Sequence, residues 1–171
     1  MEESLKNKLD AMLAHDRSVK EKSQAVEKQA RDKREEFIEL FKTHRESVLK
    51  PAIQEFADYI STNGWTAKIS TNDPHVEAGI VRSVSSSGYS IKADFFRGSS
   101  SYSGSSVPFV SFNCAANEQK ISIHSSTIGT NHGGSSGTMG SFSIGELDHS
   151  AVQRELTTYF AKLLEASRPY S

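Results

Sequence analysis

Apolar residues in the first part of the chain recur at alternating steps of four and three residues. This spacing predicts a long α-helix that carries its apolar residues in one stripe. With Leu9 at heptad position a, positions a and d stay in register for about six repeats, which favours a coiled coil or a helical hairpin. The helix stripe consists of Leu5, Leu9, Met12, Val19, Val26, Phe37 and Leu40.

Polar residues interrupt this stripe. Asp16 and Ser23 occupy a positions, and Lys33 occupies a d position. Such residues lower the stability of a coiled coil but fix its register and the number of its chains. We therefore expect a weak surface for self-association or for a partner helix. The alternative is a solvated helix that packs only at its ends, although so long a helix gains little by standing alone.

A second helix is predicted over residues 51–62. Pro51 favours a kink or a new helix start, because proline is tolerated in the first turn of a helix and disrupts its interior. Apolar residues then follow at helical spacing, and Asn63-Gly64 is a suitable stop. The apolar positions are Ile53, Phe56, Ala57 and Ile60.

Residues 65–145 alternate between apolar and polar positions, which predicts antiparallel strands with one buried face. We expect about six strands in a meander. One of them covers residues 76–84, and the last runs through Met139, Phe142 and Ile144. Serine and glycine dominate the connections at 98–106 and 129–137, and serine is also frequent on the polar sides of the strands.

The final helix is predicted over residues 149–166, with Asp148 or Ser150 as its N-cap. Its apolar stripe should cover the sheet together with the helix at 51–62. The fold class is therefore α+β. Residues 1–50 form a long charged helix for oligomerisation or partner binding, and residues 51–171 form an α+β domain with an antiparallel meander.

Charge and composition narrow the partners. The chain has 20 Lys and Arg against 21 Asp and Glu among its 171 residues, so it lacks the basic excess of most nucleic-acid and anionic-membrane binders. The basic run Arg31–Arg34 is followed by glutamates within two turns, which indicates a solvated helix face. No apolar run is long enough for a membrane span, and no secretory signal is expected.

Catalytic and metal-binding patterns are weak. No two histidines have the i, i+4 spacing of a helical zinc motif, and one cysteine excludes a cysteine-based zinc site or an internal disulfide. A composite metal site from His75, His124 and His132 with Asp94 stays open. So does a nucleophilic Cys114 with His124 as its base. We expect neither, and we expect no cofactor, no metal and no catalytic residue.

Three hypotheses follow, in this order. The first is a non-enzymatic cytoplasmic adaptor that forms a homo-oligomer or binds a partner protein through the helix stripe. The second is a module that binds a small ligand or peptide on the serine-rich sheet face and the loops 98–106 and 129–137. Its candidate residues are Arg97, Tyr102, His124 and His132. The third is a hydrolase that uses Cys114 or His124.

Overall fold

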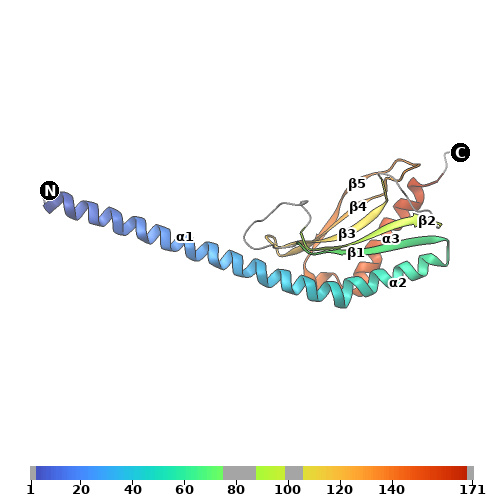
Figure 1. Ribbon diagram of the computed structural model, residues 1–171, viewed down its shortest axis with the longest axis horizontal. Coiled ribbons are helices and arrows are strands. Elements are labelled where there is room, and N and C mark those ends of the chain that lie inside the picture. Colours follow the sequence, from blue (N-terminus) through green and yellow to red (C-terminus); the bar gives the residue numbers. More distant parts are fainter. Residues whose placement is uncertain (1–2, 75–87, 99–105, 169–171) are drawn as a thin grey trace. The chain divides into compact units, whose positions relative to one another are not determined.

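A computed structural model describes residues 3–74, 88–98 and 106–168 (Figure 1). The chain divides into two units after Phe37. The first is helical. The second begins at Ile38 and contains the end of the first helix, two further α-helices and a sheet. This confirms the predicted α+β class with a long N-terminal helix.

The long helix α1 spans Glu3–His44, and helical backbone continues to Ser61. A π-helical turn, η1, covers Arg45–Leu49, and α2 covers Lys50–Ser61 with Pro51 in its first turn. The Lys50 amide donates to the carbonyl of Arg45, five residues earlier. A π turn accommodates one extra residue, and this widening directly before Pro51 relieves the clash that proline makes with the preceding turn. The predicted new helix at Pro51 therefore begins without any break in helical backbone.

The sheet is an antiparallel meander of five strands in sequence order, as predicted from the period-two pattern. The described residues contain one strand fewer than the six expected, and the predicted strand at 76–84 lies outside them. The strands are β1 Trp65–Asn72, β2 Ser90–Arg97, β3 Phe109–Ala115, β4 Lys120–Ser126 and β5 Ser136–Phe142. The last prediction ran too far, because Ile144 begins a 3-10 turn, η2 Ile144–Glu146, which Ser143 and Glu146 cap reciprocally.

One face of the sheet forms the core. The register pairs Phe95 with Ala67 and Phe112 with Ile123, so apolar residues of neighbouring strands line up on that face. Helices α2 and α3 cover it (Figure 1), as the rings of Phe56 and Tyr159 against Phe95 show. The largest fully buried side chains of this core are Phe41, Leu49, Ile53, Ile91, Phe95, Phe112, Ile121, Ile123, Leu147, Leu156, Tyr159 and Leu163.

Helix α3 spans His149–Ala166, the range that was predicted. Its N-cap is Asp148, whose carboxylate accepts a hydrogen bond from the amide of Ala151 at 2.8 Å. On the core side, the Tyr159 hydroxyl donates to the carbonyl of Ser126 at 2.9 Å. Burial raises the pKa of Tyr159, so this hydroxyl keeps its proton and remains a donor. The bond fixes α3 to the end of β4.

Arg45 is a charged residue within the core, with 5% of its surface exposed. Its Nη1 lies 2.6 Å from Oδ1 of Asp73, and its Nη2 lies 3.3 Å from Oδ2 of the same carboxylate. Nη1 also donates to the carbonyl of Ser90 at 3.5 Å. Asp73 follows β1 and Ser90 begins β2, so the guanidinium joins η1 to one end of both strands. The geometry is the paired donor fork that only arginine provides.

Replacing Arg45 with lysine should therefore lower the free energy of unfolding by about 1–3 kcal/mol, because one ammonium nitrogen cannot reproduce the two parallel N–H···O bonds that the guanidinium nitrogens make to the carboxylate. The estimate is modest because Asp73 is half exposed to water. Urea unfolding measures the change. Lys50→Met is the matched control, since it removes an exposed pair with Glu46 on the same helix. An R45K midpoint equal to that of the wild type would contradict this role.

His44 gives the domain a pH dependence. Its Nε2 donates to the carbonyl of the buried Leu147 at 2.8 Å, and burial lowers the pKa of the ring despite that bond. The unfolded chain therefore binds a proton more readily than the folded one. The resulting stability is fully present above the ordinary histidine pKa and is lost as the pH falls through the lower folded value.

We expect the free energy of unfolding to fall when the pH is lowered from 7.5 to 5.5, and this decrease to be smaller in His44→Gln. The glutamine amide can still donate to Leu147 but cannot be protonated in this range. Denaturant unfolding at the two pH values measures the difference. An equal decrease in H44Q and the wild type would exclude His44 as its source.

Candidate functional site

The first candidate surface is a groove between α2 and α3, with a volume of about 620 Å³. Trp65 of β1 also lines it, and its ring meets Phe160 edge-on at 5.1 Å between centroids. Two apolar side chains remain accessible at the groove, Tyr59 with 72% and Leu164 with 36% of their surfaces exposed. We call this set, Phe56, Tyr59, Ile60, Trp65, Phe160, Ala161 and Leu164, the helix groove.

Polar side chains also line the helix groove, namely Glu55, Asn63, Gln153 and Thr157. Glu55 of α2 faces His149 of α3 at 3.0 Å. Arg97 lies with its guanidinium 5.5 Å from the centre of the Trp65 ring. An aromatic, largely apolar hollow of this kind suits an apolar ligand or an apolar side chain of a peptide.

Sequence reasoning missed the helix groove, because it expected both helices to bury their apolar faces against the sheet. A signal was available in α3, where six apolar residues form a broader stripe than a single sheet contact needs. Tyr159 and Leu163 face the core, whereas Leu164 is exposed. The breadth of that stripe indicates a second contact on the side of α2.

The second candidate surface is the polar face of the sheet, on the side opposite the helices. Lys92 pairs with Asp94 at 2.7 Å and lies 4.6 Å from the centre of the Phe109 ring. The amide of Asn113 donates to the hydroxyl of Ser111 at 3.0 Å. Lys92, Asp94, Ser111 and Asn113 of this face are therefore engaged with one another. A hollow of about 390 Å³ lies beside Phe109, between Lys92, Val107, Ile128 and three serines.

Two of the four predicted ligand-binding residues lie on opposite faces of the sheet. His124 lies on the polar face, 6.0 Å from Phe109 between ring centres, whereas Arg97 lies on the opposite side of the sheet over Trp65. His132 lies in the connection after β4, where its Nδ1 donates to the carbonyl of Gly133 at 2.9 Å. Tyr102 lies outside the described residues. The structure thus separates Arg97 from His124.

Cys114 and His124 are also apart. In the pairing of β3 with β4, Cys114 lies opposite Ile121 and His124 lies opposite Ser111. Residues 111 and 114 are on different faces of the strand, so the structure forms no Cys–His dyad from these two. Within the described ranges, no cluster of three His, Cys, Asp or Glu residues could hold a metal ion. His75 of the composite metal hypothesis lies outside them.

Burial raises the pKa of the Cys114 thiol to about 11, so the nucleophilic thiolate is scarce at neutral pH. We expect native Cys114 to react with a chromogenic disulfide reagent at pH 8 at least about 100-fold more slowly than the urea-unfolded chain does. Absorbance kinetics measure both rates. A Ser18→Cys variant, with its thiol on exposed α1, supplies the fast native control. Equal rates for native and unfolded wild type would contradict the buried, protonated thiol.

The third candidate surface is the helix stripe on α1. Every described residue from Glu3 to Glu36 is exposed. The stripe residues Leu5, Leu9, Met12, Val19, Val26 and Leu40 have between 45% and 66% of their surfaces exposed, and Leu13 beside them has 47%. Phe37 differs from the other predicted stripe residues, because it is buried with 6% exposed. No helix in the described part of the chain is long and apolar enough to cross a membrane.

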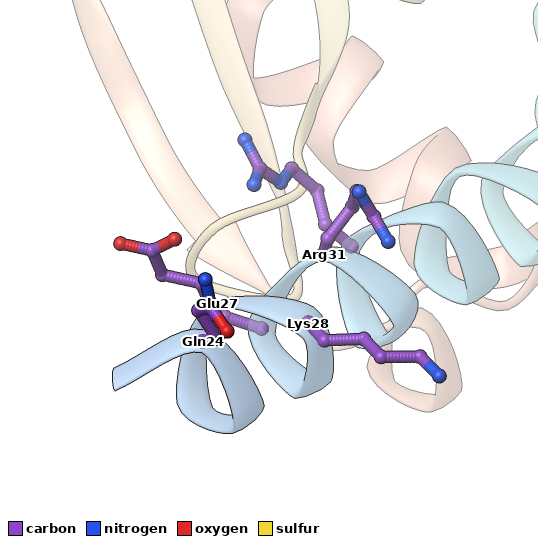
Figure 2. Close-up of a pocket in the computed structure, with 6 residues that line it drawn as sticks. Gln24, Glu27, Lys28 and Arg31 are labelled. Carbon is purple, nitrogen blue, oxygen red and sulfur yellow. The ribbon is translucent and has the colours of Figure 1, made fainter. Parts of the chain in front are cut away.

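Helix α1 also borders a hollow of about 470 Å³, and the described residues that line it all come from this helix. Figure 2 shows the side chains of Gln24, Glu27, Lys28 and Arg31 extending from consecutive turns. The charges are mixed, and Ala30 is the only apolar lining residue in the described chain. A single helix with mixed charges offers neither the enclosure of a ligand pocket nor a strong field for anions.

No known protein family, no curated protein and no solved structure matches this chain. The surfaces described above are therefore the basis for assigning a function.

Proposed function

We propose that this protein is a non-enzymatic interaction protein that self-associates, or binds a helical partner protein, through the helix stripe of α1. The exposure of that stripe carries the proposal. Six of its seven apolar residues lie open to solvent along a helix of 42 residues. Long helices in water owe most of their stability to packing of an apolar face, and every described residue of this helix from Glu3 to Glu36 is exposed.

The energetics favour a partner chain. Burying a leucine, valine or methionine side chain contributes about 1.5–3 kcal/mol, and each chain offers several, so the sum exceeds the lower estimates of the cost of association. The polar positions in the stripe reduce that gain. A moderate affinity that depends on protein concentration is the expected behaviour. The cytoplasmic location belongs to the same proposal, and it is supported by the single cysteine, a half-buried free thiol.

A second candidate function is the binding of an apolar ligand or peptide. The helix groove supports it, because accessible Tyr59 and Leu164 adjoin a hollow that reaches Trp65. This location differs from the serine-rich face and loops that the sequence suggested. On that face Lys92 pairs with Asp94 and Asn113 with Ser111, which favours the helix groove over it.

Association is tested with the full chain by light scattering over a range of concentrations. The triple variant L9D/V19D/V26D places charges on the helix stripe. It should be monomeric at concentrations where the wild type is oligomeric, because burying an unpaired charge in an interface has a large free-energy cost. The matched control is A11D/A14D/Q24D, which puts the same three aspartates on exposed positions beside the stripe. It should retain the wild-type mass.

Two results would overturn the proposal. One is a wild-type oligomer whose mass is unchanged in L9D/V19D/V26D. The other is a wild-type monomer whose stripe variant captures the same proteins from a cell extract as the control variant does.

A further inference from the structure

We propose that the partner on the helix stripe is a second copy of this chain, lying antiparallel, with the two-fold axis passing between Gln24 and Ala25. The inference rests on the proposed function and adds the identity and direction of the partner. Two charged residues within the exposed stripe, Asp16 and Lys33, carry it, because they lie equally far from that axis on opposite sides.

A parallel, in-register pair is disfavoured by these charges. In such a pair each core residue meets its own copy, so Asp16 would face the partner's Asp16 and Lys33 would face the partner's Lys33. Like charges brought together at an interface cost several kcal/mol. The stripe would then contain two repulsive layers within three heptads.

The antiparallel pair turns both layers into attractions. Reversing one helix places each a position beside a d position of the other. With the axis between Gln24 and Ala25, Asp16 meets the partner's Lys33, and Val19 meets the partner's Ala30. Leu9 meets the partner's Leu40, and the two side chains are 45% and 53% exposed in the single chain.

Other antiparallel registers lose this match. Sliding one helix by a heptad in one direction places Asp16 against the partner's Val26 and Lys33 against the partner's Leu9. Sliding it in the other direction places Asp16 against the partner's Leu40 and Lys33 against the partner's Ser23. Both shifts bury a charge against apolar or neutral groups, which costs more than an opposite pair. The two charges therefore select one register.

The flanking positions agree with this register. Lys20 lies at an e position, beside the partner's Glu27, and His15 lies at a g position, beside the partner's Glu36. Each pair occurs twice by symmetry. All four residues are exposed in the single chain, so they are accessible to a second copy. No like-charged pair arises at these flanks, which distinguishes this partner from an arbitrary helix.

Two layers are weakened. Ser23 falls opposite the partner's Val26, and Met12 falls opposite the partner's Phe37, which is buried in its own chain. The interface between the two helices therefore depends on the layers between residues 16 and 33 and on the layer in which Leu9 meets the partner's Leu40. This is consistent with a dimer that dissociates on dilution.

Chemical cross-linking of the full chain tests the direction of the helices. In V19C/A30C, each new thiol lies beside the other new thiol of the partner, so a short bismaleimide should give a covalent dimer in high yield. The single variants V19C and A30C should not cross-link, because like positions are separated by about 16 Å along the axis. The wild type, with its half-buried Cys114, is the control for background. Efficient cross-linking of V19C alone would show parallel helices and overturn the inference.

Charge reversal gives a second, independent measurement by light scattering. D16K and K33D should each weaken the dimer by roughly tenfold or more, and the double variant D16K/K33D should restore most of the wild-type affinity. A parallel dimer would respond little to either single change, and that result would also overturn the inference.

These outcomes separate the inference from the function on which it rests. A wild-type dimer that the L9D/V19D/V26D variant abolishes, but whose helices cross-link as a parallel pair, overturns only the antiparallel arrangement. A wild-type monomer whose stripe captures a foreign helical protein overturns the second-copy partner and leaves the proposed interaction function standing.

Discussion

The apolar face of the sheet is the constraint on which the second unit depends. A five-stranded meander with one apolar face is not stable in water until that face is covered. Helices α2 and α3 provide the cover, and the ring contacts of Phe56, Tyr159 and Phe160 with Phe95 are where the two layers meet. Most polar bonds described above serve this arrangement. Asp148 caps α3, Tyr159 fixes it to β4, and Arg45 holds the helical segment to the ends of β1 and β2.

Much of this could be read from the sequence because it depends on local patterns. The limits of α3 follow from an N-cap aspartate and a regular apolar spacing, and the strands follow from alternation. Ile144 was assigned wrongly because its apolar side chain continues the strand pattern, whereas the capping pair of Ser143 and Glu146 turns the backbone into a 3-10 turn. The spacing of Ser143 and Glu146 is a recognisable capping signal, but the prediction gave more weight to the hydrophobic pattern.

Other features could not be read from local patterns. The burial of Arg45 depends on Asp73 and Ser90, which are distant in sequence and are brought to it by the sheet register. The same register separates Cys114 from His124, although a short turn joins their strands. The helix groove depends on the spacing between two helices, which no single stripe reveals. The apolar stripe of α1 could be predicted from its heptads, because the spacing of residues along one helix determines it.

The π turn at Arg45–Leu49 has a consequence for how this protein can change in length. Buried residues around it, Phe41, Arg45, Leu49, Ile53 and Ala57, recur every four residues, and in a regular α-helix such a row drifts by about 40° at each step. The extra residue of the π turn reverses this drift at one step, so the row stays on the side of the helix that faces the domain core. The apolar residues of α1 before the π turn follow the heptad repeat, in which the mean spacing is 3.5 residues instead of four. Adding or deleting a whole heptad there would alter the length of the helix and keep its stripe continuous. A single-residue deletion within η1 would leave Phe41 and Leu49 seven residues apart, and a regular α-helix keeps two such residues on one face to within about 20°. The π turn is therefore the place where this helix can lose one residue without turning Phe41 away from the row that continues into α2.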